Sequence, residues 1–266
     1  MEILMKITVL CENTSACPDL AAEHGLSIFI ESEGQRILFD MGQTDAFARN
    51  AEKLGIDLSE VDFAVLSHGH YDHGGGLGEF LRINKKAPVY ISEHAFGEHY
   101  NGTEKYIGLD KTLLSSDRLV RVTGHAAISE HIEILTACPD ELPRPIEPFG
   151  LKIRRGGTLY NEDFRHEQFL RIREKGTSYL FSGCAHTGVV NLTEIFCPDV
   201  FIGGFHFSKL DPAADLSRLK NDAERLLLSK SRFYTCHCTG KEQFDVLKSV
   251  MNDRLFGIHT GFRGII

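Results

Sequence analysis

The sequence predicts an α/β fold in which helices lie outside two packed β-sheets. Short β-like segments alternate along the chain with helical ones, and strands followed by covering helices are typical of such layers. The chain has 266 residues and 42% hydrophobic content, which suffices for one large layered domain. We therefore expect a single domain over residues 1–266.

Short runs of apolar, β-branched and aromatic residues, bounded by polar residues and glycine, predict the strands. The predicted strands are Ile3–Cys11, Leu26–Glu31, Arg36–Phe39, Phe63–Ser67, Pro88–Ser92, Ile132–Leu135, Gln168–Arg173, Ser178–Ser182, Val200–Gly203, Arg232–Thr235 and Arg254–Gly257.

Apolar residues at three- and four-residue intervals predict the helices. They are Thr44–Leu54, Gly75–Ile83, Pro212–Ser229 and Lys241–Met251. The third has the clearest start, because Asp211 can cap it and Pro212 suits the first helical position.

Three imidazoles and a carboxylate directly follow the largely apolar run 61–66, at His68, His70, Asp72 and His73. Alternate side chains of an extended backbone share a face, so one metal ion can take the first two histidines and a second ion the Asp-His pair. Nitrogen and oxygen donors suit zinc, iron and manganese. The glycines that follow allow a sharp turn close to the ions. The sequence therefore predicts one or two divalent ions at the end of a strand.

Further stretches accompany this motif: Glu23–Ser27, Ile37–Gln43, Ser182–Gly188, Gly203–Phe207 and Cys236–Gly240. Together with the His-x-His-x-Asp-His pattern, they make the chain resemble the metallo-β-lactamase superfamily of metallohydrolases. Within it, the chain is similar to the branch named for dihydropterin-ribofuranosylaminobenzene phosphate synthase. The resemblance implies an αββα sandwich of two mixed β-sheets flanked by helices, and zinc as the expected metal.

Two later strand ends predict the remaining metal ligands. His186 follows the buried strand 179–182 and a glycine, and we expect it to complete the first site, with His166 as the alternative. His237 follows the strand 233–235 and should complete the second site. Many superfamily members place a bridging aspartate where this chain has Cys184, which could act as a bridging thiolate or remain a buried neutral thiol.

The substrate pocket is predicted from two further features. His24, His206 and Lys209 match or neighbour stretches of the branch, and we expect them to contact substrate, including an anionic group. The segment 93–162 holds half of the eight prolines and separates the two metal-binding halves. We expect it to be an irregular insertion that shapes the pocket.

Composition restricts the partners. A formal charge of −8 argues against nucleic acid, and no run approaches the roughly 20 apolar residues that cross a bilayer. Seven scattered cysteines indicate a reduced cytoplasm rather than a disulfide framework. We expect a soluble cytoplasmic protein that acts on a small anionic substrate and has no nucleic-acid or membrane partner. A homo-oligomer is compatible with the sequence.

The predicted reaction is hydrolysis by a metal-activated hydroxide, with Asp72 orienting the water. The branch resemblance implies a phosphorylated or phosphodiester-like small molecule as substrate. The alternatives are a thioesterase or lactonase of the same fold, a di-iron redox protein, and a non-catalytic binding protein.

Overall fold

The computed structural model describes residues 5–266, and its first sheet holds most of the N-terminal strands. Along this sheet the strands are β18 (Arg263–Ile265), β1 (Lys6–Cys11), β2 (Ser27–Ser32), β3 (Gln35–Phe39), β4 (Phe63–Val65), β5 (Val89–Ser92) and β8 (Leu119–Val122). The pairs from β3 to β8 are parallel and the others are antiparallel, so the sheet is mixed.

The second sheet is also mixed and holds most of the C-terminal strands. Its order is β17 (Leu255–Gly257), β16 (Arg232–Thr235), β15 (Val200–Ile202), β14 (Thr177–Phe181), β13 (Phe169–Glu174), β10 (Ile132–Leu135) and β9 (Ala126–Ala127). The pairs from β14 to β17 are parallel and the rest are antiparallel.

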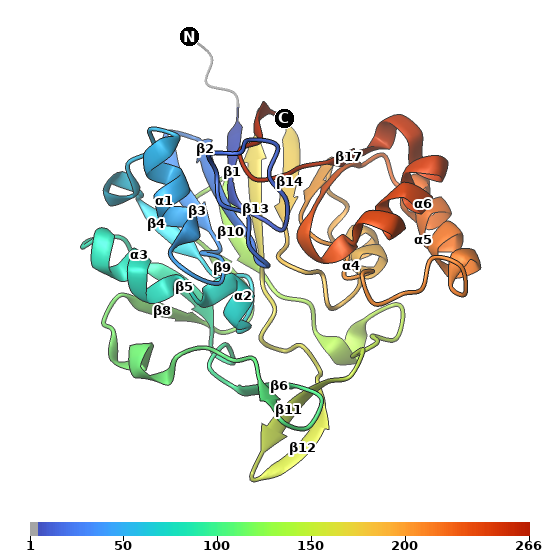
Figure 1. The fold of residues 1–266 in the computed structure, drawn as a ribbon, viewed down its shortest axis with the longest axis horizontal. Helices are drawn as coiled ribbons and strands as arrows, with labels where there is room; N and C mark the ends of the chain where they lie inside the picture. The colour runs from blue at the N-terminus through green and yellow to red at the C-terminus, as the bar shows by residue number, and fades with distance from the viewer. Residues whose placement is uncertain (1–4) are drawn as a thin grey trace.

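The helices cover the outer faces of the two sheets (Figure 1). They are α1 (Ala46–Lys53), α2 (Tyr71–Gly74), α3 (Leu77–Ile83), α4 (Val189–Phe196), α5 (Leu216–Leu228) and α6 (Lys241–Met251). Apolar side chains of both sheets form one central core, which includes Ile28, Phe39 and Phe181. Separate cores lie between the first sheet and α1 and α3, and between the second sheet and α4 to α6. The predicted αββα sandwich is confirmed.

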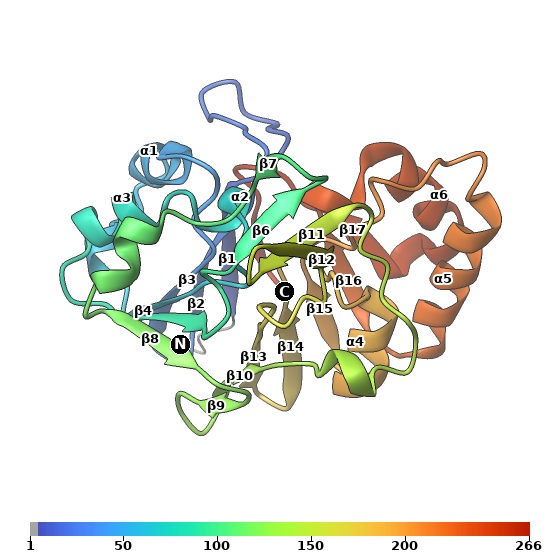
Figure 2. The same ribbon diagram turned by 90° about the horizontal axis from the view of Figure 1, so that it is seen from below.

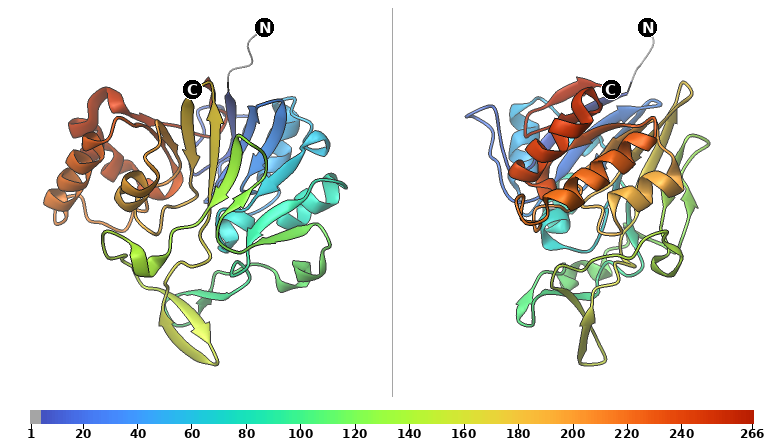
Figure 3. Two further views of the ribbon diagram at one scale, coloured as in Figure 1. Left: turned by 180° about the vertical axis from the view of Figure 1, so that it is seen from behind. Right: turned by 90° about the vertical axis from the view of Figure 1, so that its right-hand side faces the viewer.

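A third, antiparallel sheet closes one end of the sandwich. It consists of β12 (Thr158–Asn161), β11 (Leu151–Arg155), β6 (Glu98–Asn101) and β7 (Lys105–Tyr106). Figures 1 and 3 show this sheet projecting beyond the strands of both large sheets, and the view from below in Figure 2 shows it lying across that end of the sandwich. The segment 93–162 therefore holds β6 to β12, of which the sequence predicts only β10. The other strands in it are short and partly exposed, so they lack the alternating apolar pattern of a strand that covers a core.

Other differences from the predicted elements are local. Residues 3 and 4 of the predicted first strand lie outside the described residues. Helix α5 begins at Leu216 rather than Pro212, because the Asp211 carboxylate accepts the Ala213 and Ala214 N–H groups and closes a turn first. Helix α4 is missed because most of its residues are buried, which removes the amphipathic pattern. Short β18 is also missed.

Within residues 5–266, no helix has the length and apolar character needed to cross a membrane.

Gln168 ties the two large sheets together beside the metal motif. Its side-chain Nε2 donates to the carbonyl oxygens of Leu66 at 2.8 Å and Tyr90 at 3.0 Å. Its backbone N–H donates to Ser67 O at 2.7 Å. A residue that precedes β13 therefore pairs with carbonyls of Leu66, directly after β4, and of Tyr90, within β5.

We predict that Gln168→Ala destabilises the fold, because it leaves these two buried carbonyls without their side-chain donor. The free energy of unfolding, measured by urea denaturation, should fall by about 2–4 kcal/mol. The exposed Gln35→Ala is the control and should change it by less than about 0.5 kcal/mol. Equal effects of the two substitutions would contradict the assigned role of Gln168.

Candidate metal centre

The predicted metal motif lies where β4 ends and the chain turns into α2. His68, His70 and His73 are buried there. Gly69 permits this packing, because a Cβ at its position would lie 1.9 Å from the carbonyl oxygen of Ala95. The loop can therefore pass close to the chain after β5 while its side chains turn inward.

The first cluster joins His68, His70 and His186, whose ligand atoms lie within 4.8 Å of one another. The Nε2 atoms of His68 and His186 are 3.3 Å apart. Burial first, and neighbouring imidazoles next, lower the pKa of all three rings well below the usual range. The rings are therefore neutral, which is the form that binds a metal ion.

Hydrogen bonds fix the tautomer of His68. The single proton of the Ser67 hydroxyl goes to Asp40 Oδ2 at 2.7 Å. The Ser67 oxygen must then accept from His68 Nδ1, which lies 2.9 Å away. His68 Nε2 is left with a lone pair that faces His186.

The second cluster joins Asp72, His73 and His237. Asp72 Oδ2 lies 3.4 Å from His237 Nε2 and 3.8 Å from His73 Nε2, and the two Nε2 atoms are 3.2 Å apart. His73 Nδ1 donates to Asp40 Oδ2 at 2.7 Å, and His237 Nδ1 donates to Asn13 Oδ1 at 2.8 Å. When both rings are neutral, both Nε2 atoms are therefore left with lone pairs that face each other.

The spacing of the facing nitrogens fits a divalent cation. Two nitrogens bound about 2.05 Å from a tetrahedral zinc ion lie about 3.3 Å apart. The nitrogen pairs are separated by 3.3 Å in the first cluster and 3.2 Å in the second. Without a metal ion, one ring of each pair can instead carry a proton on Nε2 and donate it to the other nitrogen. Both residue sets thus match the ligand spacing of a metal site.

The charge of the second cluster supports the same interpretation. Burial opposes a charge on His73, but the Asp40 and then the Asp72 carboxylates outweigh it and raise the pKa of His73 to about 9. Burial would raise the pKa of Asp72, but the His73, His237 and His24 imidazoles hold it well below its usual range. In the metal-free protein His73 is therefore protonated at neutral pH, and a divalent ion attracted by the two carboxylates would have to displace this proton.

Cys184 lies between the two clusters. Its Sγ is 3.3 Å from His73 Nε2, and within 4.8 Å of ligand atoms from both clusters. Burial raises the pKa of this thiol well above its usual value, so a bound cation would be needed to hold it as a thiolate. The preceding Gly183 allows this approach, because a Cβ there would lie 2.2 Å from Ser67 Oγ.

Several side chains of the centre sit on left-handed backbone. The φ angles are 59° for Asp40, 53° for Ala185, 56° for His206 and 52° for His237. Such angles are uncommon for residues other than glycine and cluster at functional sites. The loops at the strand ends are therefore held in unfavourable conformations that aim their side chains at one place.

The three residues predicted to contact substrate lie at different places relative to the metal centre. His24 Nε2 lies 3.3 Å from Asp72 Oδ2, and the His206 ring contacts the His186 ring with centroids 4.2 Å apart. Lys209 is exposed and lines neither of the two cavities beside the centre. One of these, about 590 Å³, is lined by His24, His237 and Lys241. The other, about 140 Å³, is lined by His186, His206 and residues 144–147 and 149 of the predicted insertion.

Several residues that hold these ligands are not predicted from the sequence. Asp40 and Asn13 fix the imidazoles, and the Glu167 carboxylate accepts the His186 N–H at 2.8 Å. The sequence contains a signal that could have identified Asp40, because this residue follows an apolar strand as the predicted metal ligands do. His166, the alternative first-site ligand, instead accepts the Gly69 N–H through Nδ1 at 2.9 Å.

An αββα sandwich with two histidine clusters at its strand ends defines the metallohydrolase class of proteins. The family follows from the similarity of the sequence to known proteins. The sequence matches the metallo-beta-lactamase superfamily over residues 21–229, and the chain belongs to this superfamily.

Similar proteins span almost the whole chain. MJ0448 of Methanocaldococcus jannaschii is 29% identical and covers 96% of this chain and 98% of its own length. The same organism's 7,8-dihydropterin-6-methyl-4-(beta-D-ribofuranosyl)-aminobenzene-5'-phosphate synthase is 27% identical, with 90% and 89% covered. The structure of Tm1679, a metal-dependent hydrolase of the beta-lactamase superfamily, has a TM-score of 0.81 at 28% identity and covers 98% and 99%.

We predict that Asp40→Asn weakens metal binding at the second cluster, because the amide NH2 would replace one of two accepting oxygens. It would face either the Ser67 N–H, or the Ser67 hydroxyl and the His73 ring. The dissociation constant for zinc, measured against a chromophoric chelator, should rise about 10–100-fold. Asp117→Asn, at an exposed position, is the control and should leave it unchanged. Retention of full affinity by a folded Asp40→Asn protein would refute the role given to Asp40.

Proposed function

We propose that this chain is a zinc-dependent hydrolase of a phosphorylated or phosphodiester-like small molecule. The observation that carries the proposal is the pair of adjacent clusters, each with imidazole nitrogens converging at the spacing of a zinc site. Zinc is favoured over iron and manganese because imidazole predominates in both clusters and Cys184 adds a soft sulfur donor.

Bound divalent ions would supply a lowered water pKa and polarise the bond under attack. The chain itself supplies orientation. Asp72 presents Oδ2 between His237 and His24, where it can accept a hydrogen bond from an attacking water. His237 is held in one tautomer by Asn13, so the geometry around Asp72 is fixed before substrate arrives.

His206 is placed to assist the leaving group. Both of its ring nitrogens are buried and have no hydrogen-bond partner among the described residues. The ring lies against His186 and lines the smaller cavity. A substrate atom that enters there would meet an imidazole able to donate a proton to a departing oxygen.

An anionic substrate suits the larger cavity. Its lining combines His24, Lys241 and the N-terminal end of α6 with the apolar side chains of Phe244 and Ile258. A lysine and a helix N-terminus both favour negative charge. The similarity to a Methanocaldococcus jannaschii synthase named for a phosphate-bearing pterin compound supports the same substrate class.

No feature of the described residues favours the redox alternative. A di-iron centre would call for a carboxylate bridge, and the residue between the clusters is Cys184. Thioesters and lactones remain competing substrates for the same site, and a substrate panel separates them from phosphodiesters.

We predict that metal-loaded protein hydrolyses bis(p-nitrophenyl) phosphate and that Asp72→Ala lowers kcat/KM about 100-fold or more, since both a ligand and the water-orienting group are lost. Chelation should abolish turnover, and zinc should restore it. His131→Ala, at an exposed position away from the centre, is the control and should retain wild-type turnover.

A panel of p-nitrophenyl esters, thioesters and lactones assayed beside the phosphodiester tests the substrate class. Faster turnover of the carboxylic esters, thioesters or lactones would contradict the proposed phosphodiester substrate. It would not contradict the proposed hydrolase activity. Full activity of Asp72→Ala, or turnover that survives chelation, would overturn the proposed mechanism.

A further inference from the structure

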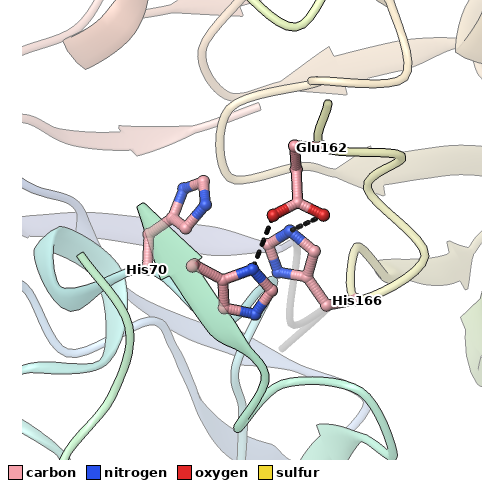
Figure 4. Close-up of side chains that lie close together, drawn as sticks. His70, Glu162 and His166 are labelled. Carbon is pink, nitrogen blue, oxygen red and sulfur yellow. Dashed lines mark hydrogen bonds and ion pairs between the residues drawn. The ribbon is translucent and has the colours of Figure 1, made fainter. Parts of the chain in front are cut away.

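A buried carboxylate next to the first cluster has no role in the function proposed above. Glu162 directly follows β12 of the third sheet, and its side chain is only 1% exposed. His70, His99 and His166 surround it, with ligand atoms within 4.8 Å of one another. Figure 4 shows the His70 and His166 rings facing the Glu162 carboxylate. We call Glu162, His99 and His166 the Glu162 group.

The Glu162 group contains the residue types of a metal site, but the tautomers of its histidines argue against metal binding. His166 Nδ1 accepts the Gly69 N–H at 2.9 Å, so the ring proton is on Nε2, which therefore has no lone pair for a metal. His99 donates its Nδ1 proton to Glu162 Oε2 at 2.7 Å.

The other nitrogen of His99, Nε2, is buried against the backbone and has no hydrogen-bond partner among the described residues. A Cβ built on Gly97 would lie 2.8 Å from His99 Nε2, so that atom abuts the backbone. The Glu162 group thus presents N–H donors to a carboxylate, and not a set of lone pairs to a cation. Its chemistry is that of a hydrogen-bond acceptor surrounded by imidazoles.

Glu162 has capacity to accept one more donor. Oε2 accepts from His99, and Oε1 accepts the Asp163 and Phe164 N–H groups through long contacts of 3.2 and 3.4 Å. His166 Nε2 lies 3.9 Å from Oε1. His70 Nε2 is buried and has no hydrogen-bond partner among the described residues.

We propose that Glu162 accepts a hydrogen bond from His70 Nε2–H and thereby reserves His70 Nδ1 for the ion of the first cluster. A carboxylate that fixes the tautomer and orientation of a ligand histidine raises metal affinity. Glu162 is then a positioning residue, and the third sheet has a function, since β12 brings Glu162 and β6 brings His99 to the metal centre. This inference rests on the metal binding assumed in the proposed function.

The test is zinc binding by the full-length protein. Metal-free protein is titrated with zinc against a chromophoric chelator, and Glu162→Gln should weaken the site containing His70 about 10–100-fold. Glu133→Gln is the matched control, because Glu133 is also a buried carboxylate but pairs with Arg171 and Arg173 on the second sheet. It should leave zinc affinity unchanged.

A second readout separates positioning from general damage to the fold. Nitrogen-15 NMR of imidazole-labelled, zinc-loaded wild type should show His70 protonated at Nε2, and this requires no variant to fold. Protonation of His70 at Nδ1, or unchanged zinc affinity in folded Glu162→Gln, would overturn the proposal. So would a third zinc ion per chain that Glu162→Gln removes, because the Glu162 group would then be a metal site itself.

These outcomes are distinct from failure of the proposed function. Zinc binding that depends on Glu162, without hydrolysis of any substrate, would support the positioning role of Glu162. It would contradict only the proposed hydrolase activity. A wild-type protein that binds no zinc would contradict both the positioning role of Glu162 and the proposed function.

Discussion

The buried carboxylate of Asp40 is the constraint on which both metal clusters depend. It lies at the end of β3 with φ of 59°, and it accepts from His73 directly and from Ser67 through both its N–H and its hydroxyl. Since Ser67 in turn accepts from His68, one carboxylate fixes a ligand of each cluster. The orientations of the His68 and His73 rings are consequences of this network.

Packing of the two sheets brings the ligands together. The first sheet supplies His68, His70, Asp72 and His73 from the end of β4, and the second supplies His186 and His237 after β14 and β16. The second motif approaches the first closely only because Gly183 has no side chain. Gln168 holds the same ends of the sheets together through buried carbonyls. The site is thus built where strand ends of both sheets converge, which is a general place for function in layered α/β folds.

The sequence predicted the layered fold and the metal motif because both leave local signals. Strand periodicity marks the sheets, and four ligand-type residues in six positions mark the metal centre. The structure brings His186 and His237 to that motif as predicted ligand positions, and it gives His166 a hydrogen bond that opposes its use as a ligand. Lys209, by contrast, is not brought to either cavity beside the centre.

The hydrogen-bond partners of the ligands could not be predicted, since they come from distant segments. Asn13 and His237 are separated by 224 residues, and His99 and Glu162 by 63. Single polar residues such as Asn13 have no periodic or motif signal, so only the folded chain shows what they contact. The short strands of the third sheet were missed for a related reason, because they do not cover a large core of their own.

The most direct test of the metal centre is an anomalous difference map, recorded at the zinc absorption edge from crystals of zinc-loaded protein. We predict two peaks, one among His68, His70 and His186 and one among Asp72, His73 and His237, with Cys184 Sγ near both. Zinc peaks located elsewhere, or no peak at either cluster in fully loaded protein, would contradict the central claim that these imidazole nitrogens are arranged to bind two divalent ions.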